Sequence, residues 1–325
     1  MKTIADFQQV FADYLQANRI QEEPEALYQP VNYIMGVGGK RLRPLLTLLG
    51  CYLFEEDTTI ALPAALAVEV FHNFTLVHDD IMDEAPLRRG KPTVHAQFGL
   101  NAGILSGDVM LIKAYDLLLK TPRIDQVRDM VDTFSKVAIK VCEGQQYDID
   151  FEKRVAVELA EYLQMIEWKT AVLLAGSLEL GAMAAGASAE NRHHLREFGR
   201  LTGLAFQLQD DYLDTFGDPE KFGKRVGGDI VQNKKTALII KALELASAPV
   251  QAELRQWYGS SPADPEEKIA AVKKIFLDLG VDAFLRDKRN QCQVTAYQHL
   301  EAVTAPDLRK KLLFDLAESL LVREM

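Results

Sequence analysis

The stretch Leu76-Val77-His78-Asp79-Asp80-Ile81-Met82-Asp83 ends a long apolar segment with three carboxylates. If the stretch is helical, Asp79 and Asp83 lie four residues apart and project from the same face, one turn above each other. Two like charges at this spacing destabilise a helix, and partial burial strengthens their repulsion. A bound cation would remove that repulsion. The stretch therefore indicates a cation site at the end of a core helix.

A second acidic stretch, Asp210-Asp211-Tyr212-Leu213-Asp214, also follows an apolar segment, residues 204–209. Carboxylate oxygens without neighbouring thiols or paired imidazoles suit Mg²⁺. This ion usually takes one or two carboxylates and fills its other positions with water and substrate phosphates. We interpret the two stretches as acidic faces on two helices that clamp hard cations.

The spacing of apolar residues predicts an all-α fold. They recur at intervals of three and four almost throughout, as in Phe7, Val10, Phe11 and Tyr14, and no sustained alternation of period two interrupts them. Loop-forming glycine and proline stretches are sparse, and none looks like an interdomain linker. We expect residues 1–325 to form a single domain, a bundle of many helices.

Composition restricts the class of partner and the compartment. The chain is 48% hydrophobic and carries a formal charge of -10, which argues against nucleic acid as a partner. Its three cysteines, Cys51, Cys142 and Cys292, lie far apart, as in a protein of the reducing cytosol. The most apolar segment, residues 171–187, is interrupted by Glu179 and predicts a packed central helix. We expect a cytoplasmic protein without stable membrane insertion.

Local basic clusters must then bind any anionic substrate. In Gly38-Gly39-Lys40-Arg41-Leu42-Arg43-Pro44, the glycines allow close approach of a ligand, beside which Lys40 and Arg43 offer positive charge. A solvated basic loop is the alternative. His72 precedes Asp79 by seven residues, close to two helical turns, and shares its face. The alternative for His72 is simple packing.

Further cations follow each acidic stretch. Pro86 ends the first helix and delivers Arg88 and Arg89, a pair suited to a metal-bridged diphosphate, although an ion pair with Glu84 is the alternative. Lys169 is a candidate anion-binding residue only if other anion-binding groups lie beside it, and a solvated lysine is the alternative. Residues 217–236 combine lysines with glycines, as in a lid that closes over phosphates or a solvated loop. We assign the rest of the chain, from Ala237, to packing.

These motifs, in this order, resemble the trans-isoprenyl diphosphate synthase family along about residues 35–236. The resemblance rests on GGKRLRP, on both Asp-Asp-x-x-Asp motifs, on the arginine pair after the first, on Phe206-Gln207 before the second, and on Gly223-Lys224 with Gly228-Asp229. It implies antiparallel helices around a deep central cavity, usually in a homodimer. The implied reaction joins isopentenyl diphosphate head-to-tail to an allylic diphosphate and releases diphosphate.

The resemblance also implies roles for individual residues. Asp79, Asp83 and Asp210 would coordinate Mg²⁺, about three ions per site, with Asp80, Asp211 and Asp214 in support. The allylic diphosphate would be held by Arg88, Lys169, Thr170, Gln207, Lys224 and Lys234. Isopentenyl diphosphate would be held by Lys40, Arg43, His72 and Arg89. The groups expected to act in catalysis are Asp79, Asp80, Asp83, Arg88, Lys169, Asp210 and Lys224. One departure is Asn233 before Lys234, where many members have glycine.

Product length follows from the same resemblance. In this family, bulk at the fourth and fifth positions before the first aspartate closes the floor of the tail cavity, and Thr75 and Phe74 stand there. This combination resembles synthases that stop near C20, which implies geranylgeranyl diphosphate. Phe71, one turn further down, is an alternative floor. Farnesyl diphosphate or a longer polyprenyl diphosphate, a terpene cyclase and a non-catalytic partner subunit remain the competing readings.

Overall fold

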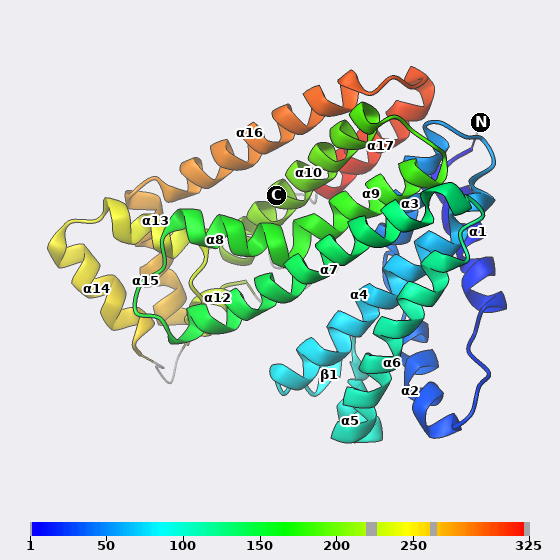
Figure 1. The fold of residues 1–325 in the computed structure, drawn as a ribbon. Coiled ribbons are helices and arrows are strands. Elements are labelled where there is room, and N and C mark those ends of the chain that lie inside the picture. Colours follow the sequence, from blue (N-terminus) through cyan, green and yellow to red (C-terminus); the bar gives the residue numbers. More distant parts are fainter. Residues whose placement is uncertain (1, 219–225, 261–264, 322–325) are drawn as a thin grey trace. The chain divides into compact units, whose positions relative to one another are not determined.

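The computed structural model describes residues 2–218, 226–260 and 265–321. As predicted, the fold is all-α, and the described strands are two residues long (Figure 1). The helices are α1 (Ile4–Ala17), α2 (Glu25–Gly36), α3 (Leu42–Tyr52), η1 (Thr58–Ala61), α4 (Leu62–Met82), α5 (Val94–Phe98), α6 (Leu100–Leu119), α7 (Ile124–Lys153), α8 (Leu159–Ile166), η2 (Glu167–Ala171), α9 (Val172–Ala184), α10 (Ala189–Phe216), α12 (Gly228–Val231), α13 (Ala237–Leu245), α14 (Ala248–Tyr258), α15 (Pro265–Asp278), α16 (Val281–Ala302) and α17 (Asp307–Leu321). The strands β1 (Leu87–Arg88) and β2 (Lys91–Pro92) pair antiparallel.

The helices divide into two compact units. The first comprises Met1–Lys136, Gly176–Leu195 and Thr304–Leu312, and the second Val137–Ala175, Arg196–Val303 and Leu313–Met325. The first acidic motif lies in the first unit and the second motif in the second unit. The expectation of a single domain stays a prediction.

Helix α4 is the core of the first unit and packs chiefly against α6 (Figure 1). Most of its side chains are buried, and Pro63 occupies the first turn, where a missing N–H costs nothing. Gly107 of α6 allows the close approach, because a Cβ there would lie 2.2 Å from the His78 ring. The α6 backbone thereby lies close to α4 just before the first acidic motif begins.

One helical stretch, residues 58–82, is long and apolar enough to cross a membrane by composition alone. However, 78% of its most apolar window is buried inside the protein. Burial of this kind is what a core helix shows.

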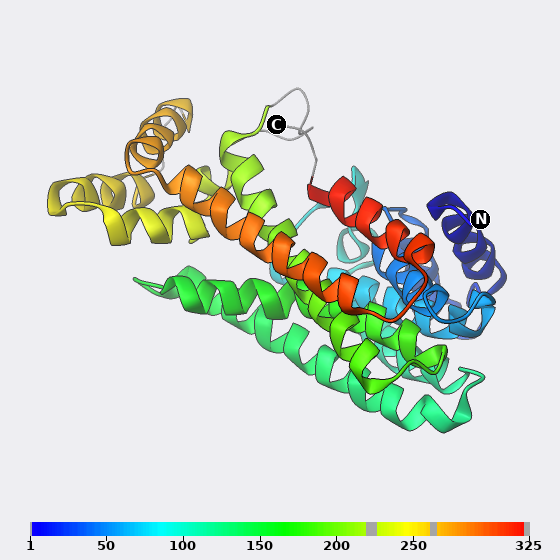
Figure 2. The same cartoon turned by 90° about the horizontal axis from the view of Figure 1, so that it is seen from above.

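The second unit has its own apolar core, which includes Leu208, Ile240 and Phe276. The predicted helix at residues 171–187 is α9, and it is preceded by the π-helix η2. Such wide turns are rare and are frequent at functional sites. Short helices α13, α14 and α15 pack together, as their yellow to light orange ribbons show (Figure 2).

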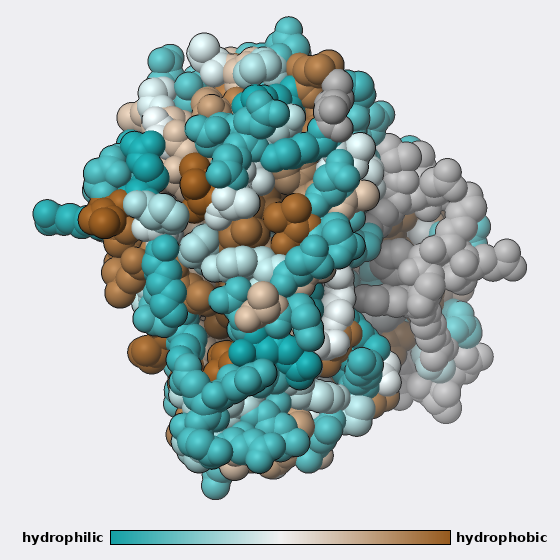
Figure 3. Space-filling view, turned by 90° about the vertical axis from the view of Figure 1, so that its right-hand side faces the viewer, coloured by the Kyte–Doolittle hydropathy of each residue, from teal (hydrophilic) through white to brown (hydrophobic). Residues whose placement is uncertain are grey.

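The face of the molecule shown in Figure 3 is predominantly polar. On the face in Figure 3, hydrophobic residues are interrupted by hydrophilic ones. All three cysteines are free thiols, and Cys142 is exposed.

Candidate active site

The C-terminal end of α4 presents the first acidic motif. Asp79 is partly exposed, and Asp83 is the exposed C-cap, whose N–H donates to the Asp79 carbonyl at 2.9 Å. Asp80 points inward instead and is only 1% exposed. The motif therefore directs its first and last carboxylates away from the core and its middle one into it, as a helical period requires.

Arg88 neutralises the buried carboxylate. Its Nε lies 2.8 Å from Asp80 Oδ2 and its Nη2 lies 2.8 Å from Asp80 Oδ1, while Nη2 is 3.6 Å from Asp79 Oδ2. The two-stranded hairpin β1–β2 delivers this arginine after Pro86. The structure thus pairs Arg88 with the acidic motif itself, rather than with Glu84 as the sequence alternative had it.

Arg89 turns the other way, toward the glycine loop. It adopts a left-handed conformation, with φ 53°, and its guanidinium donates to the Gly38 carbonyl. A Cβ at Gly39 would lie 2.4 Å from Arg89 Nη1, and Gly39 itself has φ 123°. Glycine is therefore required there both for the backbone conformation and for the approach of the arginine.

Arg43 and His72 meet beside this loop. Arg43 Nη1 lies 3.1 Å from His72 Nε2, and Arg43 Nε is buried without a hydrogen-bond partner among the described residues. Desolvation, reinforced by the Arg43 charge, holds the pKa of His72 well below its usual value. Desolvation also lowers the pKa of Arg43 to about 10. The cluster is thus short of negative charge, which an incoming anion would supply.

Sequence reasoning missed the group that anchors the glycine loop. Arg41, at φ 48°, donates to the carboxylate of Glu69 and to the Met35 carbonyl. Asn73 donates to Glu69 Oε1 at 3.0 Å. Glu69 is 3% exposed and stands three residues before His72, on the same side of α4. That spacing was the available signal.

The second acidic motif lies in the last turns of α10. Asp210 and Asp214 are partly exposed, whereas Asp211 is 7% exposed and accepts a hydrogen bond from Tyr162 at 2.6 Å. Desolvation raises the pKa of Asp211 to about 7 despite this bond. Tyr162 precedes its partner by 49 positions, and no local pattern in the sequence pointed to it.

Asp214 has a structural contact of its own. Its Oδ2 accepts the Asp229 N–H at 2.9 Å, and its carbonyl accepts from the Gly227 N–H at 2.5 Å. Lys234 then lies beside Asp229, with Nζ 3.3 Å from Oδ1. The structure therefore brings Asp214, Asp229 and Lys234 together.

Lys169 projects from the π-helix η2 and lies 2.5 Å from Asp148 Oδ2 of α7. Thr170 follows it in the same wide turn, and Gln207 lies on α10 one turn before Asp211. A Cβ at Gly144 would lie 2.3 Å from the Lys169 backbone nitrogen, so α7 approaches η2 closely. Lys224 lies outside the described residues.

The residues predicted to limit the product belong to an aromatic cluster in the first unit. Phe74 lies 5.6 Å from Phe71 between ring centroids, and Phe71 meets Phe134 edge-on at 5.2 Å. Phe134 in turn meets Tyr115 at 5.1 Å. Thr75 is small and donates its hydroxyl to the His72 carbonyl. Two residues that the sequence did not single out, Phe134 and Tyr115, belong to this cluster.

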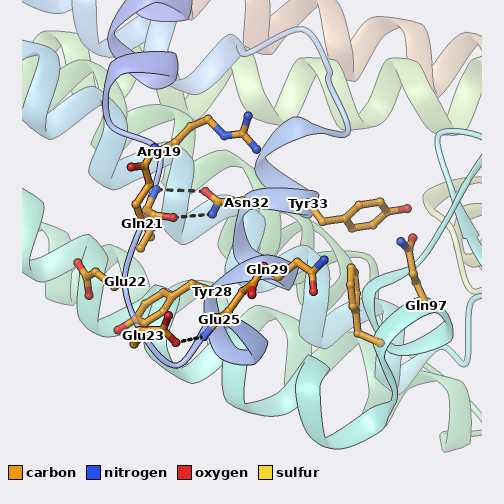
Figure 4. Close-up of a pocket in the computed structure, with 12 residues that line it drawn as sticks. Arg19, Gln21, Glu22, Glu23, Glu25, Tyr28, Gln29, Asn32, Tyr33 and Gln97 are labelled. Carbon is orange, nitrogen blue, oxygen red and sulfur yellow. Dashed lines mark hydrogen bonds between the residues drawn. The ribbon is translucent and has the colours of Figure 1, made fainter.

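A pocket of about 590 Å³ in the first unit contains none of the predicted site residues (Figure 4). It lies between the segment after α1, helix α2 and helix α5. Asn32 closes one side through two hydrogen bonds with the Ile20 backbone, and Tyr28, Tyr33 and Gln97 line the rest. Its carboxylates, Glu22, Glu23 and Glu25, make it a poor site for a diphosphate.

Comparison with known proteins agrees with the geometry. The polyprenyl synthetase family matches residues 24–275. A geranylgeranyl diphosphate synthase from Methanosarcina mazei is 42% identical over 253 residues, which cover 78% of this chain and 76% of that protein. A geranylfarnesyl diphosphate synthase from Natronomonas pharaonis is 34% identical over 319 residues, covering 93% and 91%. A solved geranylgeranyl pyrophosphate synthase structure is similar with a TM-score of 0.94, at 43% identity and 100% coverage of both chains.

The all-α isoprenoid synthase fold and the two acidic motifs thus define a prenyltransferase. The chain belongs to the polyprenyl synthetase family. The resemblance of its motifs to trans-isoprenyl diphosphate synthases is confirmed.

Proposed function

We propose that the protein condenses isopentenyl diphosphate with an allylic diphosphate in a Mg²⁺-dependent head-to-tail reaction and releases diphosphate. The observation that carries this proposal is the cluster around the end of α4. There Arg88 contacts the acidic motif, while Arg89 contacts the glycine loop that leads to Arg43. A carboxylate pair and a basic loop side by side suit a metal-bound diphosphate next to a metal-free one.

Isopentenyl diphosphate is assigned to Lys40, Arg43, His72 and Arg89. The low pKa of His72 keeps its imidazole neutral, so that Nε2 accepts from Arg43 and orients the guanidinium. The unpartnered Arg43 Nε offers a further donor. Bidentate arginine binding suits the oxygens of a diphosphate better than a point charge does.

Asp79, Asp83 and Asp210 fit Mg²⁺, about three ions per site, by the chemistry of their donors. All are oxygen ligands, and no three His, Cys, Asp or Glu side chains converge in the described part of the chain as they would around a pre-built metal site. This is expected where phosphate oxygens and water complete the coordination. When bound, the metal stabilises the negative charge that develops on the leaving diphosphate.

The chain's own cationic and polar side chains share that work. The allylic diphosphate group leaves as its C–O bond breaks. Its assigned ligands are Arg88, Lys169, Thr170, Gln207, Lys224 and Lys234. The isopentenyl double bond then attacks the allylic carbocation, and the released diphosphate is positioned to accept the proton that is lost. No protein nucleophile is required. Buried apolar side chains such as Phe74 and Val77 exclude water from the cation.

Geranylgeranyl diphosphate is the proposed product. Phe74 is buried and contacts Phe71, which in turn contacts Phe134, so the proposed floor is a cluster of packed aromatic rings rather than one side chain. Interiors packed in this way resist displacement by a growing chain. The named relatives include both geranylgeranyl and geranylfarnesyl synthases. Farnesyl and longer products are therefore the alternatives to test.

The exposed face of α6 supports the proposed homodimer. Leu105, Ile112 and Leu119 recur every seven residues and are 57%, 66% and 62% exposed. A stripe with this spacing is suited to packing against another helix. We therefore assign the face to a second copy of the chain, and Ile112→Glu should shift sedimentation from dimer to monomer. A wild-type monomer would contradict the assignment.

A cytoplasmic location is proposed from the free thiols and negative charge.

The deciding experiment incubates the protein with Mg²⁺, isopentenyl diphosphate and each of the C5, C10 and C15 allylic diphosphates, and separates the dephosphorylated products. A dominant C20 alcohol is expected, and Phe74→Ala should lengthen it. Products at C15, or a series of products above C20, would support the proposed condensation but contradict the assignment of Phe74 as the floor of the cavity. A cyclic hydrocarbon would favour a terpene cyclase. If no Mg²⁺-dependent product forms, the alternative that the protein is a non-catalytic partner subunit would be favoured.

A further inference from the structure

Lys268 is a buried lysine in the part of the chain that the sequence assigned to packing. It lies on α15 and is 1% exposed. Lysine is almost never fully buried unless its charge is paired. No ion pair involves Lys268 within the described ranges. An apolar residue of the same length would pack there without the cost of burying an ammonium group.

The ammonium group of Lys268 makes specific contacts instead. Its Nζ donates to Asn233 Oδ1 at 2.5 Å and to the Ser260 carbonyl at 3.0 Å. The ring centroid of Tyr258 lies 5.6 Å away, within the range of a cation–π interaction. Desolvation lowers the pKa of Lys268, in keeping with the burial. The side chain therefore joins α15 to Asn233, two residues after the end of α12.

Asn233 is the unusual residue of that segment. It adopts φ 58°, and its N–H donates to the Ile230 carbonyl at 3.2 Å, closing the turn that ends α12. Few non-glycine residues adopt this conformation without help, although asparagine is among those that do. The hydrogen bond from Lys268 fixes the Asn233 side chain in this turn.

The turn determines where the next residue lies. Lys234 donates its N–H to the Asp229 carbonyl at 2.9 Å, and its Nζ lies 3.3 Å from Asp229 Oδ1. The Asp229 N–H is in turn bound by Asp214 Oδ2. A continuous set of contacts therefore runs from Lys268 through Asn233 and Lys234 to Asp229 and the second acidic motif.

We propose that Lys268 is a positioning residue for the allylic diphosphate: its ammonium holds Asn233 in the left-handed turn that places Lys234 beside Asp229. The assignment of Lys234 to that diphosphate rests on the function proposed above. Lys268 itself is assigned to neither substrate. It acts on the reaction only through the geometry of residues 227–236.

The first test is Lys268→Met, with Lys274→Met, an exposed lysine on the same helix, as the matched control. Lys268→Met should lower kcat/KM for the allylic diphosphate about 10- to 100-fold, the range expected when a binding group is misplaced by an ångström. The KM for isopentenyl diphosphate should change less than about twofold, because its assigned residues lie in the other unit. Lys274→Met should match wild type. Equal losses for both substrates, or none, would overturn the proposal.

A second test uses Asn233→Gly, since glycine adopts positive φ without the side-chain hydrogen bond. If Lys268 acts by holding Asn233, adding Lys268→Met to Asn233→Gly should not lower kcat/KM for the allylic diphosphate any further. Additive losses would contradict the proposed route. Should Lys268→Met fail to fold, Lys268→Gln replaces it with the opposite expectation: it keeps a donor for Asn233, so kcat/KM for the allylic diphosphate should stay within about twofold of wild type, and a larger loss would contradict the proposed route.

Hydrogen exchange separates this inference from the proposed function. Lys268→Met should increase amide exchange in a peptide covering residues 227–236 at least about tenfold, whether or not prenyl transfer is detected. Unchanged exchange there would overturn the positioning role even in an active enzyme. Absence of prenyl transfer by the wild type would instead overturn the proposed function.

Discussion

The two acidic motifs share their spacing but differ in how the protein treats the middle aspartate. In both, the flanking carboxylates are partly or fully exposed, and the middle one, Asp80 or Asp211, is buried. Asp80 is paired with the Arg88 guanidinium at 2.8 Å. Asp211 instead meets the neutral phenol of Tyr162, and its pKa is raised to about 7. One buried carboxylate is paired with a cation, whereas the other accepts a hydrogen bond from a neutral group.

The last aspartates differ as well. Asp83 caps the end of α4 and is exposed. Asp214 lies within α10 and accepts the Asp229 N–H, so it holds the segment that carries Lys234. Identical spacing thus supports two arrangements: a helix end directed at solvent, and a scaffold for a second loop. The comparison shows that helical spacing determines which way the carboxylates of a motif point. The group that each buried carboxylate contacts determines how its charge is compensated.

The largest effect is expected where the motifs are alike. Asp79→Ala and Asp210→Ala should each lower kcat/KM at least ~10³-fold, because each would remove a proposed Mg²⁺ ligand and metal catalysis of this kind contributes several kcal/mol. Prenyl transfer at saturating Mg²⁺ measures the loss. Asp132→Ala, at an exposed aspartate on α7, is the control and should be silent. Near-normal turnover in either motif variant would remove that motif from the metal assignment.

The next effect should distinguish the motifs. Arg88→Met should lower the free energy of unfolding by about 3 kcal/mol, because it leaves the Asp80 charge buried and uncompensated. Urea denaturation measures this loss. Adding Asp80→Asn should restore most of the stability while activity stays low. If the double variant is no more stable than Arg88→Met, the charge of Asp80 is not what Arg88 compensates.

Tyr162→Phe should cost less, about 1–2 kcal/mol, and its cost should depend on pH. Asp211 has a folded pKa of about 7 against an ordinary value of 3.8. Between these values the folded state binds more protons than the unfolded one, so this group's contribution to stability falls as pH rises through that window. The phenol lowers the pKa of Asp211, so its loss extends the window above pH 7. Unfolding in EDTA should therefore show a larger cost at pH 8 than at pH 6. An equal cost at both would contradict the assignment.

The smallest effect is expected at Asp214. Asparagine keeps an oxygen that accepts the Asp229 N–H, so Asp214→Asn should change kcat/KM less than about tenfold. Asp83→Asn, by contrast, should raise the Mg²⁺ concentration needed for half-maximal activity. A magnesium titration of both variants makes the comparison. Similar titration curves would mean that the two last aspartates have the same role.

The sequence by itself determined the class and the local directions. Periodicity predicted the all-α fold, and the spacing of Asp79 and Asp83 placed both carboxylates at one end of a helix. The motif resemblance identified the family, which the comparisons confirm. These features are local, because helical geometry and motif spacing depend on residues a few positions apart.

Only the tertiary structure decided which groups surround those motifs. Tyr162 reaches Asp211 across 49 positions, Lys268 reaches Asn233 across 35, and Arg41 reaches Glu69 across 28. No helical or strand period relates such positions. Burial then decides their charge, because a pKa depends on the solvent excluded by distant segments and on the partner they bring. The pKa of Asp211 and the placement of Lys268 were therefore beyond what spacing could predict.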